Sequence, residues 1–234
     1  MDNKRGKQYI NRNYHRQYQN FKQNKINTKK RPNWFLSIPI DDQEIKTKFE
    51  NVQKHVECVN PGLREACVPI EKSHLTLFVF YTENIEKVND IVSQVIDNYM
   101  FEKEIKIEAD EIGHFSQQVI FSKLSMSADF QQLWQTLADA LLHNSIISPK
   151  DANFKNFKPH LTLMKLSKIK EGKSFREKIQ KIPLDMFEEF KGMKFGSQFA
   201  KEIQLLSRDL PVQENGNYYC MKSFKLNIIP NKDL

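Results

Sequence analysis

Two short stretches of the sequence carry the same four residues, His-Leu-Thr-Leu, beginning at His74 and at His160. The chain has six His and six Thr in 234 residues, so about 0.15 His-x-Thr pairs (6 × 6/234) are expected by chance, against the two found here. An imidazole can take or give a proton near neutral pH, and a hydroxyl can donate a hydrogen bond to a phosphate oxygen. The repeated motif therefore indicates acid–base chemistry on a phosphate group.

In a β-strand, residues two apart share a face. His74 and Thr76 therefore point to one face of their strand, as do His160 and Thr162 on theirs, while the leucines of both motifs point to the opposite, buried face. If a pseudo-twofold axis relates the two halves of the chain, the two pairs converge on one cleft. One histidine can then remove a proton while the other supplies one. The alternative, strand residues facing solvent or an ordinary polar pocket, fits a single His-x-Thr better than an identical pair.

The sequence offers no obvious metal site. His/Thr pairs without nearby Asp, Glu or Cys make a poor zinc or magnesium site, so we expect no metal and no cofactor. Cys58, Cys67 and Cys220 are an odd number without a Cys-x-x-Cys, which argues against a disulfide framework. No apolar run approaches the ~18 residues of a membrane span, and the N-terminus lacks the apolar segment of a signal peptide. We expect a reduced intracellular protein, cytoplasmic or nuclear, without membrane contact.

The spacing of apolar residues predicts the elements that position the motifs. Strands are expected at 34–40, 74–80, 104–112, 119–124 and 160–166, and near 202–208 and 217–228. Helices are expected after Asp41 or Asp42, over 85–99 and after Ser127, with a shorter helical region at about 174–191. We expect the strands at 104–112 and 119–124 to pair across a turn containing Gly113. Antiparallel strands interrupted by helices define an α+β class, and the two His-Leu-Thr-Leu strands mark a weak internal duplication.

The net charge of +7 is unevenly distributed. Residues 1–32 hold ten Lys and Arg and one acid, for +9, whereas 33–234 hold 26 bases and 28 acids, for −2. The first segment has too few apolar residues to offset its ordering entropy, so we expect a disordered basic arm at 1–32 and a folded domain at 33–234. Three interpretations of the arm stay open. It contacts RNA, or its basic run at 29–32 serves as a weak nuclear-import signal, or it is a solvated tail without a specific partner.

Four longer stretches carry a resemblance to a known family. Together with the duplicated His-x-Thr, they are similar to the two-histidine (2H) phosphoesterases, and within these to the central AMP-binding, 2′,5′ RNA ligase-like domain of A-kinase anchoring proteins. The resemblance covers about 33–228. The stretches are "PNWFLSIPI" (32–40), "IGHFSQQVIFSKL" (112–124), "FKPHLTLMKLSK" (157–168) and "NGNYYC" (215–220).

This resemblance implies two lobes related by a pseudo-twofold axis, each with an antiparallel sheet and flanking helices, around a central cleft. It also implies metal-independent cleavage of 2′,5′-linked oligoadenylate in a site that binds AMP or CMP. The anchoring members of the family carry a C-terminal amphipathic helix that binds the kinase regulatory subunit. This chain ends "LNIIPNKDL", so we do not expect it to anchor the kinase.

The expected reaction resembles that of a metal-free ribonuclease. One histidine removes the proton of the free 3′-hydroxyl, the other protonates the departing 5′-oxygen, and Thr76 and Thr162 hold the non-bridging oxygens, which gives a 2′,3′-cyclic phosphate. The sequence does not say whether His74 or His160 is the base. Two alternatives stay open: a catalytically idle nucleotide- or RNA-binding module, and a 2′,3′-cyclic phosphodiesterase or RNA end-processing enzyme.

Base recognition is expected to use aromatic stacking. Phe115, on a loop beside Gly113, is the first candidate and Tyr219 the second; core packing is the alternative for both. His114 stands where the similar domains have a small polar residue. It is either an extra phosphate contact or a solvent-facing loop histidine.

Overall fold

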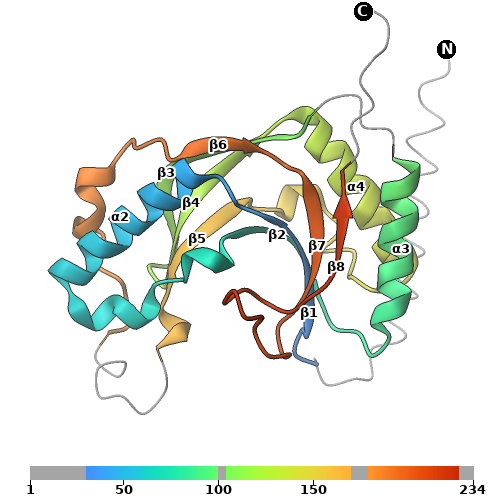
Figure 1. The fold of residues 1–234 in the computed structure, drawn as a ribbon, viewed down its shortest axis with the longest axis horizontal. Coiled ribbons are helices and arrows are strands. Elements are labelled where there is room, and N and C mark those ends of the chain that lie inside the picture. The colour runs from blue at the N-terminus through green and yellow to red at the C-terminus, as the bar shows by residue number, and fades with distance from the viewer. Residues whose placement is uncertain (1–29, 100–103, 170–178, 227–234) are drawn as a thin grey trace, which may run out of the picture.

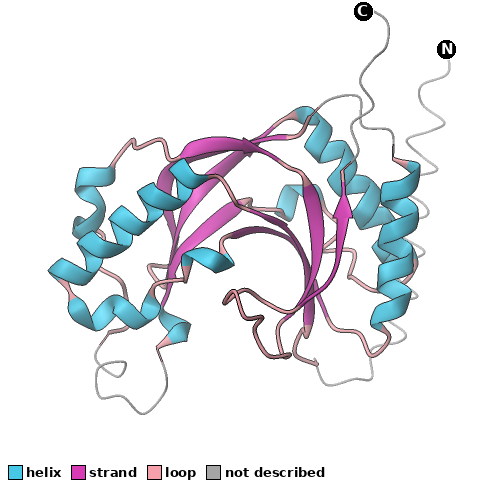
Figure 2. Cartoon of the chain, viewed as in Figure 1, coloured by secondary structure: helices cyan, strands magenta, loops and turns pink. Residues whose placement is uncertain are grey.

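The computed structural model describes residues 30–99, 104–169 and 179–226, which form two four-stranded antiparallel sheets with helices on the outer sides (Figures 1 and 2). The expected basic arm lies outside the described residues except for 30–32. The first sheet has the order β2-β1-β7-β8: His74–Phe80, Trp34–Pro39, Glu202–Ser207 and Cys220–Lys225. The second has the order β5-β4-β3-β6: His160–Lys165, Val119–Met126, Lys106–Phe115 and Gly196–Phe199.

In the part of the chain that the structure describes, three α-helices connect these strands: α2 Gln43–Val59, α3 Ile85–Asn98 and α4 Ala128–His143. Short 3₁₀ helices are η1 Pro61–Ala66, η2 Ile70–Lys72, η3 Phe154–Asn156, η4 Leu166–Lys168 and η5 Asp185–Phe190. Helix α2 begins where the sequence predicted, because the Asp42 side chain accepts a hydrogen bond from the Ile45 amide at 2.9 Å. Within the described ranges, no helix is both long and apolar enough to cross a membrane.

The two lobes exchange their connecting helices. Helix α2 joins β1 to β2 of the first sheet but packs on the second: the rings of Phe49 and Phe195 lie 4.8 Å apart, and Gln53 Nε2 donates to the Leu163 carbonyl at 3.0 Å. Helix α4 joins β4 to β5 of the second sheet but packs on the first, where Trp134 meets Phe78 with ring centroids 4.8 Å apart. Each lobe is therefore completed by a helix from the other half of the chain.

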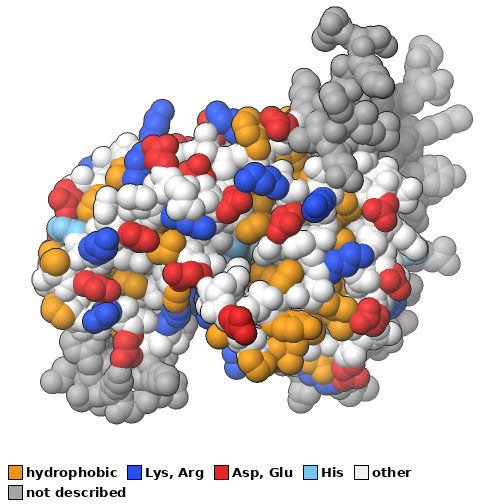
Figure 3. Space-filling model, in the orientation of Figure 1, with side chains coloured by type: hydrophobic (Ala, Val, Ile, Leu, Met, Phe, Trp, Pro, Cys, Tyr) orange, Lys and Arg blue, Asp and Glu red, His pale blue; other side chains and the backbone are white. Residues whose placement is uncertain are grey.

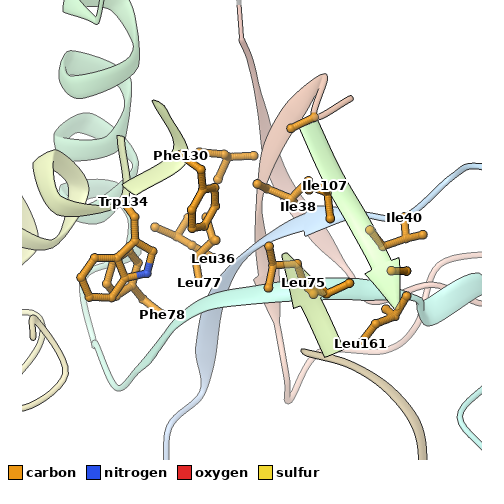
Figure 4. Close-up of a cluster of buried hydrophobic side chains, with 14 of the residues drawn as sticks. Leu36, Ile38, Ile40, Leu75, Leu77, Phe78, Ile107, Phe130, Trp134 and Leu161 are labelled. Carbon is orange, nitrogen blue, oxygen red and sulfur yellow. The ribbon is translucent and has the colours of Figure 1, made fainter. Parts of the chain in front are cut away.

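One hydrophobic core spans both lobes. Figure 4 shows side chains from both sheets and from α4 meeting in a single cluster, among them Leu36, Trp134 and the motif leucines Leu75 and Leu161. Both motif leucines are fully buried. Burial of this kind stabilises the fold by about 25 cal/mol per Å² of apolar surface, so the motif strands are anchored from behind.

The structure corrects three local expectations. Gly113 does not lie in the turn between β3 and β4; it lies within β3 opposite Phe121, and the turn is made by Ser116 and Gln117 at φ of 50° and 58°. The helical region expected at 174–191 is reduced, in its described part, to the 3₁₀ helix η5; residues 170–178 lie outside the description. Strand β6 was not expected, because four residues with a glycine carry little alternation.

Candidate active site

The two motif strands lie close together at the centre of the molecule. β2 and β5 come from different sheets and contact each other between the lobes (Figure 1). His74, Thr76, His160 and Thr162 are all half-buried, while the leucine beside each of them is buried, as the strand alternation predicted. The space-filling view shows histidine surface in the hollow between the lobes (Figure 3). The structure thus brings the two His/Thr pairs to one place, and their catalytic role stays a prediction.

Both motif strands carry a β-bulge at the same position. Leu36 pairs with Phe78 and Ser37 with Thr76, so Leu77 has no partner on β1. On β5, Leu163 is skipped in the same way, between residues that pair with Ile120 and Phe121. A bulge shifts the alternation by one residue. The internal duplication is therefore visible in the backbone as well as in the sequence.

The two histidines are oriented by equivalent hydrogen bonds. His74 Nδ1 lies 2.7 Å from the Lys72 carbonyl, and His160 Nδ1 lies 2.7 Å from the Lys158 carbonyl. A carbonyl oxygen only accepts, so Nδ1 carries the hydrogen in both rings. Nε2 is then the nitrogen that is left to take or give a proton.

Aromatic rings hold each histidine in place. His74 contacts Phe35 and Tyr218, with ring centroids 5.1 and 5.8 Å away. His160 contacts Phe115 and Phe121, at 5.1 and 5.2 Å. Each imidazole therefore has two aromatic neighbours that limit its rotation and its access to water.

Gly113 makes room for one of these rings. A Cβ at this position would lie 2.8 Å from the Phe121 ring, well inside van der Waals contact. The glycine therefore serves close packing beside His160 rather than a turn conformation.

Burial makes both histidines hard to protonate. The pKa of His74 is lowered from 6.5 to about 4, chiefly by burial and further by the charge of His160, against a smaller upward effect of the Lys72 carbonyl. The pKa of His160 is also lowered, chiefly by burial, with the nearby ammonium of Lys165 adding to the effect against the Lys158 carbonyl. Without a bound anion, the fold favours the neutral form of both rings.

The base-stacking candidates have different surroundings. Phe115 is 38% exposed at the end of β3 and contacts His160. Tyr219 is exposed as well, but the residue that contacts His74 is its neighbour Tyr218. Tyr218 was not predicted, because the sequence "NYYC" does not indicate which tyrosine points inward. A stacking role for Phe115 or Tyr219 stays a prediction.

Other polar groups surround the motif residues. Among the described residues, neither threonine hydroxyl has a hydrogen-bond partner, and Ser37, which pairs with Thr76 on β1, has a buried hydroxyl without a partner. Thr76 and His160 also line a pocket of about 340 Å³, together with Lys150 and Asn156. The half-buried Thr76 and Thr162 hydroxyls are free to donate to a bound phosphate, whereas Ser37 is fully buried.

Two other sequence expectations can be placed. His114 lies on β3, not on a loop; it is exposed, and alternation sends its side chain to the face opposite that of Phe115. Among the described residues, no group of three or more His, Cys, Asp or Glu is arranged to hold a metal ion. Metal-independent chemistry stays a prediction, to be tested by chelation.

The fold is that of the 2H phosphoesterases. The protein TT0787 of Thermus thermophilus superimposes with a TM-score of 0.57 at 19% identity, over 83% of this chain and 97% of that one. E. coli LigT in its apo form superimposes with a TM-score of 0.52 at 17% identity, also over 83% of this chain and 97% of that one. At these identities the likeness shows the fold alone.

The family follows from the sequence comparison. The family described as the AKAP7 2′5′ RNA ligase-like domain matches residues 32–226, and the chain belongs to it. Human A-kinase anchor protein 7 isoform gamma is 32% identical over 205 residues, which are 82% of this chain and 56% of that protein. The chain thus spans a little over half the length of this curated relative. The resemblance noted in the sequence is confirmed.

Proposed function

We propose that the protein is a metal-independent phosphodiesterase that cleaves 2′,5′-linked oligoadenylate or related oligonucleotides at its two His-x-Thr motifs. One observation carries the proposal: two histidines with the same hydrogen-bonded orientation lie on adjacent bulged strands, each with a threonine beside it. Membership of a 2′5′ RNA ligase-like family supports the substrate class. E. coli LigT, of the same fold, has been crystallised with 3′-AMP, in agreement with a nucleotide ligand.

The roles of the two histidines follow from their surroundings. Burial lowers the pKa of His74 to about 4, so the ring is neutral at pH 7 and is assigned here as the base that removes the proton of the 3′-hydroxyl. His160 acts as the acid. A phosphate bound beside it raises its pKa and lets it hold the proton that it gives to the departing 5′-oxygen.

The bond changes are balanced without a further reactant. The 3′-oxygen bonds to phosphorus as the bond from phosphorus to the 5′-oxygen breaks, which leaves a 2′,3′-cyclic phosphate and a 5′-hydroxyl. Thr76 and Thr162 donate hydrogen bonds to the non-bridging oxygens, where charge grows in the transition state. His74 takes up one proton and His160 gives one up. After each turnover His74 must therefore release a proton to solvent and His160 must regain one.

The decisive experiment offers several substrates to the purified protein in EDTA. These are 2′,5′- and 3′,5′-linked adenylate dimers and 2′,3′-cyclic AMP, with products separated by chromatography. We expect the 2′,5′ dimer to give a 2′,3′-cyclic phosphate. If 2′,3′-cyclic AMP is hydrolysed and neither dimer is cleaved, the 2′,3′-cyclic phosphodiesterase alternative is favoured. Tight AMP binding without turnover of any substrate would favour an idle nucleotide-binding module. Activity that is lost in EDTA and restored by a divalent ion would contradict the metal-independent mechanism.

Substitution of either histidine tests the site itself. His74→Ala and His160→Ala should each lower kcat by roughly 10²–10⁴-fold, as expected for the loss of an acid or base. The double variant should lose far less than the product of the two effects, because the pair works as a unit. His143, exposed at the end of α4, provides the matched control His143→Ala. Near-normal turnover by either single variant would contradict the proposed acid–base roles of His74 and His160.

The basic arm at 1–32 is proposed to add electrostatic affinity for longer RNA. Its +9 charge stands against −2 for the rest of the chain. Deleting it should flatten the salt dependence of binding to a 20-nucleotide strand, by a slope of ~0.7 per phosphate no longer neutralised. Equal slopes for both proteins would make it a passive tail. Cytoplasmic or nuclear location, and the absence of kinase anchoring, stay predictions.

A further inference from the structure

The two sides of the candidate active site differ in charge, although their backbones match. The twin bulges return the third residue after each threonine to the exposed side of its strand. On β2 this residue is Val79, and on β5 it is Lys165. The duplicated fold therefore does not require a lysine here, and the difference points to a ligand group that meets only the β5 side.

Two further lysines lie on that side. The segment that leads from α2 to β2 runs along the edge of β5, where Cys67 bridges Met164 and the Val68 amide donates to the Leu163 carbonyl at 2.9 Å. Lys72 ends this segment, and Lys168 ends η4, directly after β5. Lys72, Lys165 and Lys168 are together called the lysine cluster.

The lysine cluster is tied to both histidines. The backbone carbonyl of Lys72 orients His74, and the Lys72 ammonium lies 4.9 Å from the centre of the Tyr218 ring, which itself contacts His74. Lys165 is close enough to His160 to lower its pKa. The cluster therefore borders the place where the scissile phosphate is proposed to bind.

The charges of the lysine cluster are not neutralised by the protein. Within the described ranges, none of the three ammonium groups forms an ion pair with a carboxylate, although many other surface lysines do. The pKa of Lys168 is lowered, first by partial desolvation and then by repulsion from Lys72. The Glu71 side chain, next to Lys72 in sequence, has its Cγ about 4 Å from where a Cβ on Gly216 would lie, in the loop before β8. Lys72 and Lys168 repel each other, and Lys165 lies near His160 on the same side of the site; ammonium groups without a counter-ion favour binding of an anion.

We propose that Lys72, Lys165 and Lys168 bind a second phosphate group of the substrate, next to the phosphate that is cleaved. The proposal rests on the proposed function. The lysine cluster would make the proposed enzyme selective for substrates that carry a second phosphate beyond the scissile one. That phosphate is either a terminal 5′-phosphate or the next internal phosphodiester, since lysine meets both as a point charge.

Three 2′,5′-linked substrates separate these cases: the dimer ApA, the 5′-phosphorylated dimer pApA and the trimer ApApA. Lys168→Gln should lower kcat/KM by about tenfold on substrates whose second phosphate binds the lysine cluster, which is the loss expected for one charged hydrogen bond. The kcat/KM for ApA, which has no second phosphate, should stay nearly unchanged. A loss on pApA assigns the terminal phosphate, and a loss on ApApA assigns the internal one. Lys225→Gln, an exposed lysine at the end of β8, is the control. An equal change on all three substrates, or no change on any, overturns the proposal.

A binding measurement keeps the test independent of turnover. Titration calorimetry of the full chain compares adenosine 2′-monophosphate with adenosine 2′,5′-bisphosphate, which differ only by the 5′-phosphate. The bisphosphate should bind the unaltered protein more tightly, and Lys168→Gln should remove that advantage while affinity for the 2′-monophosphate stays. If no substrate is cleaved yet this pattern appears, the proposed function fails and the second phosphate site stands. If the unaltered protein binds the two ligands with equal affinity, the proposed second phosphate site does not exist.

Discussion

His74 should make the stability of the fold depend on pH between about 4 and 6.5. Its pKa falls from 6.5 to about 4 in the folded protein because the ring is buried beside Phe35 and Tyr218 and near His160. As pH falls below 6.5, the unfolded chain takes up this proton first, while the folded chain resists until about pH 4. Stability from this group is therefore complete above pH 6.5 and is lost progressively toward pH 4.

The size of the effect follows from the two pKa values. A lowering from 6.5 to about 4 corresponds to about 3 kcal/mol of unfolding free energy in full, of which roughly 2.5 kcal/mol is lost between pH 7 and pH 4.5. This is a large part of the ~5–15 kcal/mol that stabilises a typical domain. The variant His74→Gln removes the titrating group and should lack this component.

Urea unfolding at pH 7 and pH 4.5, followed by tryptophan fluorescence, measures the difference in each protein. Comparing the differences cancels any constant cost of the substitution, together with the titration of the carboxylates. The unaltered protein should lose roughly 2.5 kcal/mol more than His74→Gln over this range. His143→Gln should behave as the unaltered protein does. If His74→Gln loses as much stability as the parent, His74 is not held neutral by burial.

Four other substitutions or profiles extend the argument. Gly113→Ala should cost roughly 1–3 kcal/mol in urea unfolding, because the added Cβ displaces the Phe121 ring; an unchanged stability would mean that the ring moves freely. Tyr218→Ala should raise KM for a dinucleotide more than Tyr219→Ala, and the reverse order would restore Tyr219 as the stacking residue. Ser37→Ala should raise stability by about 1 kcal/mol in the same assay, because its buried hydroxyl has no partner; a loss would reveal one. Finally, kcat/KM should peak below pH 6.5, since both motif histidines have lowered pKa values; a peak above pH 7 would contradict these values.

Much of the fold is encoded locally, where periodicity reports burial. The apolar spacing from Ile45 to Val56 predicted the buried face of α2, and that of α4 was predicted in the same way. The 3₁₀ helix η5 and strand β6 escaped prediction because they are short and owe their form to packing against other parts of the chain. The exchange of helices between lobes could not be predicted, since nothing in the sequence of α2 says which sheet its apolar face will meet.

In the candidate site, too, the features that follow from local strand alternation were predicted, and those that depend on packing were not. The common face of His74 and Thr76 follows from strand alternation alone, so it was predicted correctly. The bulge at Leu77 was present in the sequence as a break in alternation, since Leu77 and Phe78 are adjacent apolar residues that are both buried. Tyr218 was missed because the strand expected near 217–228 includes both tyrosines, whereas β8 begins only at Cys220 and leaves Tyr218 in the preceding loop.

The exchanged helices also bear on how such a chain could arise. A half-length ancestor with one His-Leu-Thr-Leu strand would have left part of its sheet uncovered, because the helix between its first two strands packs on the neighbouring lobe. Two copies could have completed each other only by swapping helices, as in a domain-swapped dimer. In the present chain the partner is covalently attached, and β7 and β8 return to the first sheet after the second is finished. Neither half is then a domain in its own right, and fragments cut between α3 and β3 should regain structure only when mixed.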